Sequence, residues 1–258
     1  MSGTIQRMAQ RLLGRGDQIT KVRKDVVLRT PAFYNRHLGR KILVMGTGSS
    51  LREHGQKIKE FVATNDVIVI GTNMVPDTFT VDYHGFSNRR RFRQFGRSID
   101  AASSRGLLSV HFPDNMIATY CDAPYDLIMW LNTEDPLDNS VGENGVIRHY
   151  GTSGTLMMLV AYAMGADQVY IAGMDGSDLS VIKNGGQLDP HEYRHTYYEY
   201  PGFADAKQAE KSAYWFQIQT KTMAAICEWA ISQSRNPLVS LTPTHCGPYH
   251  DPSVLGSH

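Results

Sequence analysis

Short apolar runs alternate with longer mixed stretches along most of the chain. The runs are continuous rather than alternating in polarity, which is typical of strands buried on both faces of a parallel sheet. We predict strands at 41–46, 66–73, 77–85, 106–112, 167–175 and 236–243. We predict helices at 49–63, 152–165 and 204–233. This order indicates an α/β fold with a Rossmann-like, mostly parallel sheet flanked by helices.

Three segments do not follow this alternation. Residues 126–132 fit a strand or a short helix, and residues 133–151 have the composition of a loop. Residues 176–203 form a long stretch rich in Gly, His and Tyr, and loops of that length are usually functional or disordered. We therefore predict a single domain over residues 41–258 with a small lid at 176–203, preceded by an N-terminal segment, 1–40.

Positive charge gathers in the N-terminal segment. The formal net charge of the 258 residues is +1, yet residues 1–41 contain ten Lys or Arg and only two Asp. Apolar residues at positions 5, 8, 9 and 12 share one helical face, which predicts a basic amphipathic helix. Such a helix would lie on an anionic membrane surface, or would pack against its own domain or a second subunit of a homo-oligomer.

Composition and the cysteines indicate the compartment. Hydrophobic residues make up 41% of the chain and charged residues 20%, as in soluble globular proteins. No apolar stretch of the secretory type follows the N-terminal charges, and the three cysteines show no paired spacing. We expect a cytoplasmic protein, with the inner membrane as the surface available to the basic segment.

A glycine-rich turn follows the first predicted strand. It consists of Gly46, Thr47, Gly48 and Ser49. Such a turn lets backbone N–H groups and a helix N-terminus approach a phosphate, although a tight turn without a ligand has the same composition. The third glycine of a dinucleotide-binding fingerprint is replaced by Leu51, and the second strand ends at Asn73 rather than at an acid. Both differences disfavour NAD.

A second group of small polar residues opens the helix predicted at 152–165. Thr152 or Ser153 fits the N-cap, and Gly165 fits the C-terminal glycine. Gly154 lies in the first turn, where glycine costs about 1 kcal/mol relative to alanine. Capping does not explain this glycine, whereas close approach of a ligand would explain it.

These motifs together resemble a known family. They are GTGSSL, an Asn after the second strand, TSG at the start of an apolar helix, and A-x-x-x-G-A-x-x-V-Y-I-A-G-M-D over residues 161–175. The set resembles the bacterial sialyltransferases of glycosyltransferase family 42, and the wider superfamily with motility-accessory-factor glycosyltransferases and hydroxymethylpterin diphosphokinases. It covers about residues 41–245. The resemblance implies a nucleotide-sugar-binding catalytic domain that uses a CMP-activated sugar, inverts the anomeric centre and needs no metal or cofactor.

The resemblance also implies a donor site. Its nucleotide-binding residues would be Gly46, Thr47, Gly48, Ser49, Asn73, Thr152, Ser153, Gly154 and Asp175. Family 42 has Asn where this chain has Thr47. The family's general base is a histidine after the lid, in the pattern H-Y-x-x-H. The same four-residue spacing here makes His195 the first choice and His191 the second.

Two family tyrosines that contact the leaving phosphate have no direct counterpart. Gly176-Ser177-Asp178 stands at their place. Tyr193 and Tyr197, with the tyrosines at positions 198 and 200, would take over their function. A histidine has a reference pKa near 6.5, which suits it to removing a proton from an acceptor hydroxyl.

We therefore expect transfer of a sialic-acid-type sugar from a CMP-activated donor to a hydroxyl of a glycan or glycolipid acceptor. One alternative is a diphosphokinase-like phosphotransferase that binds Mg²⁺ through Asp175 or Asp178. Another is a non-catalytic nucleotide- or polyanion-binding module that uses the basic run RRRFR at 89–93. An exposed helix face also accounts for that run, and nucleic acid is the less expected partner.

Overall fold

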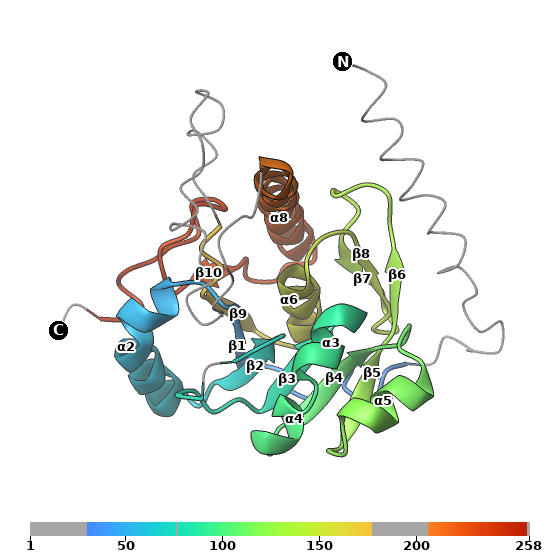
Figure 1. Ribbon diagram of the computed structural model, residues 1–258. Coiled ribbons are helices and arrows are strands. Elements are labelled where there is room, and N and C mark those ends of the chain that lie inside the picture. Colours follow the sequence, from blue (N-terminus) through green and yellow to red (C-terminus); the bar gives the residue numbers. More distant parts are fainter. Residues whose placement is uncertain (1–29, 76, 177–205, 257–258) are drawn as a thin grey trace.

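The computed structural model describes residues 30–75, 77–176 and 206–256, which form an α/β fold (Figure 1). Its main sheet has seven parallel strands in the spatial order β10-β9-β1-β2-β3-β4-β5. The strands are β1 (Lys41–Met45), β2 (Ile68–Thr72), β3 (Tyr83–Phe86), β4 (Arg105–Ser109), β5 (Tyr125–Ile128), β9 (Gln168–Ala172) and β10 (Val239–Ser240). The predicted Rossmann-like fold class is confirmed.

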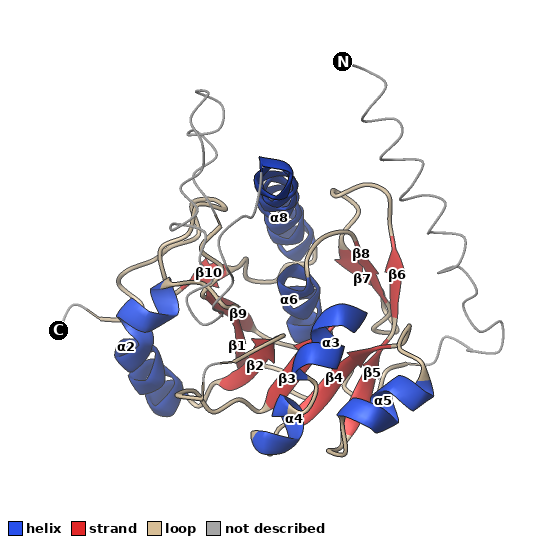
Figure 2. Ribbon diagram, in the orientation of Figure 1, coloured by secondary structure: helices blue, strands red, loops and turns tan. Residues whose placement is uncertain are grey.

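Helices cover both faces of this sheet (Figure 2). They are α2 (Ser50–Asn65), α3 (Arg89–Phe95), α4 (Ser98–Ala101), α5 (Asp114–Tyr120), α6 (Ser153–Ala163) and α8 (Ala206–Ser232). Ile42 and Val44 of β1 belong to the apolar cluster of α6 and α8, whereas Leu43 and Met45 belong to that of α2. Successive strand residues point to opposite faces, so a strand that is apolar throughout serves both layers. Among the described residues, no helix is both long enough and apolar enough to cross a membrane.

Helix α6 lies at the centre of the fold. Every residue from Gly154 to Ala163 is buried, as expected for a helix that is apolar on all sides. Thr152 is its N-cap, and Gly165 follows its C-terminal end with a φ of 88°. Both assignments agree with the sequence prediction, because small side-chain caps and left-handed glycines are local signals.

Several stretches differ from the prediction, among them the strand predicted at 236–243, of which only β10 is formed. The strand predicted at 77–85 is shorter, since β3 begins only at Tyr83. Residues 126–132 divide between β5 and β6 (Trp130–Asn132), which belong to different sheets. The prediction of a loop at 133–151 is wrong, because β7 (Ser140–Val141) and β8 (Ile147–His149) complete a three-stranded sheet with β6. Strands of two or three residues carry no periodic signal, so only their pairing reveals them.

The described end of the N-terminal segment packs against the domain. Phe33 is fully buried in the cluster around α6. The backbone N–H groups of Asn35 and Gly39 donate to the carbonyl oxygens of Ala163 and Gly165 at the C-terminal end of that helix. The predicted amphipathic helix at residues 4–13 lies outside the described residues.

A buried carboxylate ties the N-terminal segment to the far edge of the sheet. The side chain of Asp126 on β5 is 2% exposed and forms salt bridges with Arg36 and Arg105. Burial by itself raises the pKa of Asp126, but hydrogen bonds from Arg105 and Arg36 outweigh it and hold this pKa below its ordinary value. The carboxylate is therefore charged at neutral pH and joins two segments that are distant in sequence.

Replacing Asp126 with Asn should lower the free energy of unfolding at pH 7 by about 2–3 kcal/mol, because two arginines lose their buried partner. The pKa of Asp126 is lower in the folded chain, so its contribution exists above the unfolded-state pKa and disappears as pH falls through the folded-state pKa. Urea unfolding at several pH values between about 7 and 3 measures this. An Asp126→Asn protein with unchanged stability at pH 7 would contradict the assignment.

Candidate functional site

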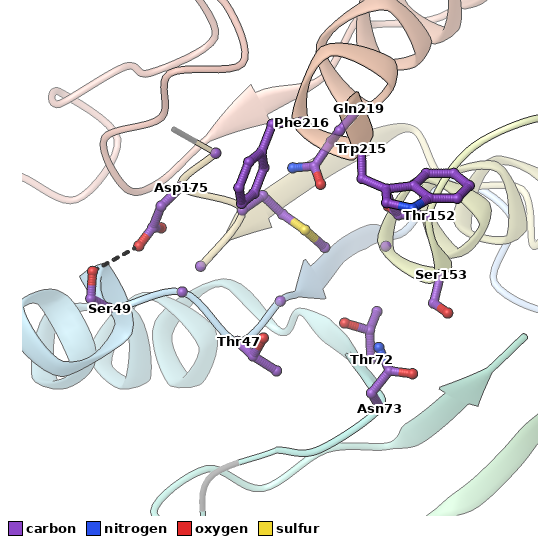
Figure 3. A pocket seen from close by; sticks show the side chains of 16 residues that line it. Thr47, Ser49, Thr72, Asn73, Thr152, Ser153, Asp175, Trp215, Phe216 and Gln219 are labelled. Atoms are coloured by element: carbon purple, nitrogen blue, oxygen red, sulfur yellow. Dashed lines mark hydrogen bonds between the residues drawn. The ribbon is translucent and has the colours of Figure 1, made fainter. Parts of the chain in front are cut away.

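A pocket of about 270 Å³ opens at the carboxyl edge of the sheet, where β1 and β9 lie side by side (Figure 3). From β1 the strand order runs to β2 on one side and to β9 on the other, which makes this the topological switch point of the sheet. Open α/β sheets bind ligands at such points. All nine residues that the sequence assigns to the nucleotide site line this pocket.

The two glycines of the turn after β1 are required by the protein's own chain. A Cβ at Gly46 would lie 2.3 Å from the carbonyl oxygen of Gly173, and one at Gly48 would lie 2.4 Å from the carboxylate of Asp175. The backbone N–H of Gly48 donates to Gly173 at 2.8 Å. Gly46 is therefore needed to pack the loop after β9, and Gly48 leaves room for the Asp175 carboxylate. These two glycines do not indicate by themselves that a ligand approaches.

Asp175 occupies the N-terminus of α2. Its carboxylate accepts a hydrogen bond from the hydroxyl of Ser49 at 3.2 Å (Figure 3). It also accepts from the backbone N–H of Ser50 at 2.9 Å and from the hydroxyl of Ser50. The sequence predicts that this helix N-terminus attracts an anion. The anion in the structure is the protein's own carboxylate, which satisfies the helix dipole.

The N-terminus of α6 forms another wall of the pocket. The Thr152 side chain accepts from the backbone N–H of Thr155, and the Thr155 hydroxyl accepts from the N–H of Thr152 in return, which makes a capping box. The hydroxyls of Ser153 and Ser87 lie 2.6 Å apart. A Cβ at Gly154 would lie 2.6 Å from Cε of Met174. The close approach that the sequence predicts at Gly154 is thus made by Met174.

Asn73 carries an unsatisfied polar atom at the end of β2. Its φ is 58°, a left-handed conformation that asparagine tolerates better than most residues. Its backbone N–H donates to Gly85, whereas its buried side-chain oxygen Oδ1 has no hydrogen-bond partner in the described part of the chain. Leaving such an atom unpaired costs about 1–3 kcal/mol.

Helix α8 closes the pocket with side chains that the sequence analysis missed. They are Trp215, Phe216 and Gln219 (Figure 3). Trp215 remains 38% exposed, and its ring packs edge-on against that of Tyr214 at 5.5 Å. An exposed indole at a pocket offers a flat apolar surface to a base or a sugar ring. A tryptophan within a long helix is more often part of a core, so only its position in the fold identified it.

The pocket has little charge of its own. Asp175 is its only ionisable acid or base among the described lining residues, which include no Lys, Arg or His. The described ranges also contain no group of three or more His, Cys, Asp or Glu residues suited to a metal ion. Neutral donors and helix termini therefore dominate the chemistry of this part of the site.

Two buried histidines lie outside the pocket lining. Burial lowers the pKa of His84 to about 4 and that of His149 to about 3, so both rings are neutral at physiological pH. Nε2 of His149 lies 3.0 Å from the Thr155 hydroxyl, behind the capping box of α6. His149 supports the structure around the site, because it fixes the hydroxyl that completes the cap of α6.

The predicted catalytic residues are not placed by the structure. His191, Tyr193, His195 and Tyr197 lie outside the described residues, as does Asp178 of the metal alternative. The described part of the chain ends at Gly176 and begins again at Ala206. Gly176 and residues of α8 both line the pocket. The roles of these four residues stay predictions from the sequence.

Replacing Asp175 with Ala should lower the free energy of unfolding by about 1–2 kcal/mol, because α2 loses its N-terminal acceptor and the charge that complements its dipole. Urea unfolding of this variant is compared with Asp167→Ala, which removes an exposed carboxylate at the start of β9. Equal stabilities of the two variants would show that the capping interaction contributes nothing.

A scan of protein-family models found no match to this chain, and a comparison with curated proteins found none either.

Proposed function

We propose that the protein is an inverting glycosyltransferase that moves a sialic-acid-type sugar from a CMP-activated donor to a hydroxyl of a glycan or glycolipid acceptor. One observation carries the proposal. Nine residues that the family resemblance assigns to the donor nucleotide come from four separate segments of the chain, and all nine line one pocket at the switch point of the sheet. A set chosen by accident would not be expected to converge in this way.

The donor phosphate fits the N-terminus of α6 better than that of α2. A phosphate at α2 would meet the Asp175 carboxylate, and like charges in close contact repel. At α6 the first-turn N–H groups of Ser153 and Gly154 lack intrahelical partners, as at every helix start, and no acid stands in the first turn. Both residues line the pocket, so the helix dipole would act on the phosphate there.

The remaining groups suit a nucleoside. The side-chain amide of Asn73, which lines the pocket, would hydrogen-bond to a ribose hydroxyl or to the cytosine ring. Trp215 and Phe216 would pack against a ring. A neutral pocket with few, well-placed polar atoms is typical of small-molecule sites.

The reaction requires two further functions. The departing CMP phosphate gains charge as the sugar becomes oxocarbenium-like, and fixed donors at the start of α6 would stabilise that charge. The acceptor hydroxyl must lose a proton as it attacks from the opposite side of the sugar, which inverts the anomeric centre. His195 is the predicted base for that proton, with His191 as second choice, and Tyr193 and Tyr197 would contact the leaving phosphate.

The phosphotransferase alternative has less support. A magnesium site needs carboxylate oxygens that are free to bind the ion. Both oxygens of Asp175 accept hydrogen bonds from Ser49 or Ser50. The lining also offers no described Lys or Arg for a transferred phosphoryl group. EDTA would abolish the activity of such an enzyme and would leave a metal-independent transferase unchanged. The cytoplasmic location and the membrane association of residues 1–40 stay predictions.

CMP should raise the thermal midpoint of the protein and NAD should not. A ligand at about 100 times its Kd stabilises the folded state by about 2.7 kcal/mol. Replacing Asn73 with Gly removes the amide but tolerates the positive φ, and it should weaken CMP binding about tenfold. Asn35→Gly is the matched control, since Asn35 is exposed, has a φ of 55° and is not among the pocket residues. No shift with CMP at millimolar concentration would exclude the donor assignment.

His195→Ala should slow sugar transfer by at least about 10²-fold, which is the ordinary contribution of a general base. CMP should still raise the thermal midpoint of this variant. Transfer is measured by release of CMP in the presence of acceptor, and His191→Ala is compared in the same assay. Near-normal turnover of His195→Ala together with a strong loss of turnover in His191→Ala would identify His191 as the base. Normal turnover of both variants would exclude either histidine as the general base.

A further inference from the structure

Helix α3 begins with arginines where a helix favours acids. Its first turn contains Arg89, Arg90 and Arg91 and no acidic residue. The positive end of the helix dipole lies there, so each cation is slightly destabilising. Arg89 and Arg93 are four residues apart and share a helix face, where like charges also repel. Asn88 offsets part of this cost by accepting from the N–H groups of Arg90 and Arg91.

Several other arginines of the fold are paired with acids, whereas the two on this face are not. Arg97 pairs with Asp100 and Asp122, and Arg36 and Arg105 share Asp126. Within the described ranges, neither Arg89 nor Arg93 forms a salt bridge, and both are exposed. Arrangements that break a local rule without compensation tend to occur at functional sites. An anion from outside the chain would supply the missing partner.

This basic face lies at the carboxyl edge of the sheet, beside the pocket. Ser87 joins β3 to α3, and its hydroxyl meets that of Ser153 at the start of α6, which lines the pocket. A guanidinium N–H of Arg89 donates to the backbone carbonyl of His111, just after β4. The guanidinium of Arg89 is thus held close to the end of β4, and in the strand order β3 and β4 follow β2, on the side of β1 opposite to β9.

We propose that Arg89 and Arg93 bind a carboxylate or phosphate group of an acidic oligosaccharide, which is the acceptor for the sugar bound in the pocket. This inference rests on the proposed function. A guanidinium matches such oxyanions with paired hydrogen bonds, so two arginines on one face would fix both the binding and the orientation of the acceptor. The acceptor would lie along the carboxyl edge with its hydroxyl directed to the donor pocket.

An oligosaccharide fits this face better than a polymer or a membrane. Single-stranded nucleic acid is bound by a basic groove with exposed aromatic rings. Here Phe92 is fully buried and Phe95 packs against the cluster around it, so α3 presents no free aromatic ring of its own. Lipid headgroups bind to broader clusters of about four to eight basic residues. Of the four arginines in the run 89–93, Arg89 and Arg93 are the pair at four-residue spacing. The start of α3 adjoins the start of α6 through the contact of Ser87 with Ser153, which suits an acceptor subsite.

Binding of trigalacturonate to the full chain tests the proposal, with maltotriose as the neutral probe. Calorimetry should show binding of trigalacturonate that weakens as NaCl rises from about 0.05 to about 0.5 M, because salt screens exposed charges. Arg89→Gln/Arg93→Gln should weaken it about tenfold, which corresponds to about 1.4 kcal/mol. Arg89→Lys/Arg93→Lys should retain part of it. Lys57→Gln/Lys221→Gln, which removes the same charge from exposed positions on α2 and α8, should leave it unchanged.

Further measurements separate the acceptor site from the donor site and from other polyanion-binding surfaces. The shift of the thermal midpoint with CMP should be the same in Arg89→Gln/Arg93→Gln as in the wild type, which separates this test from that of the donor site. Undetectable trigalacturonate binding, or equal binding by the Gln pair and the wild type, would overturn the acceptor site. Tighter binding of oligo(U) RNA or of phosphatidylglycerol vesicles, lost in the same Gln pair, would overturn it in favour of a polyanion or membrane surface.

Discussion

The contact between the turn after β1 and the loop after β9 holds the site together. Gly46 and Gly48 leave room for the backbone of Gly173 and the carboxylate of Asp175. That carboxylate then caps α2 through Ser50. The two central strands and the first helix are thereby fixed to one another at the switch point of the sheet. A side chain at Gly46 would separate the two loops, and one at Gly48 would displace the Asp175 carboxylate, so the pocket depends on this close packing.

The same contact changes how the glycine-rich turn functions. In a dinucleotide-binding turn the glycines and the helix N-terminus face a phosphate. Here a loop of the chain itself fills both places, which leaves the start of α6 as the available positive helix end. The candidate site is therefore lined by the N-terminus of a buried helix, the side chain of Asn73 and an aromatic wall from α8. Its electrostatics depend on dipoles rather than on charged side chains.

Charged side chains contribute in two different ways elsewhere. Asp126 joins Arg36 and Arg105, so charge there serves the fold. Arg89 and Arg93 have no acidic partner within the described ranges, and Arg89 stands in the first turn of α3, where the helix dipole opposes it. Local propensity predicts neither arrangement, because one depends on a partner about ninety residues away and the other is unfavourable for its own helix. The unpaired arginines near the carboxyl edge of the sheet thus differ from the paired arginines that stabilise the fold.

The sequence by itself determined the α/β alternation, the caps of α6 and the set of small polar residues at strand ends, because these follow from local periodicity and from glycine, serine and threonine chemistry. It could not place the short strands β7 and β8 or the pocket wall formed by α8. Strands of two or three residues are identified only by their pairing, and the role of a helical tryptophan depends on residues that are distant in sequence. It also assigned the close approaches at Gly46, Gly48 and Gly154 to a ligand. Only the tertiary structure decided that Gly173, Asp175 and Met174 make these close approaches. A glycine in the sequence indicates that another group lies close to the backbone, but it does not identify that group.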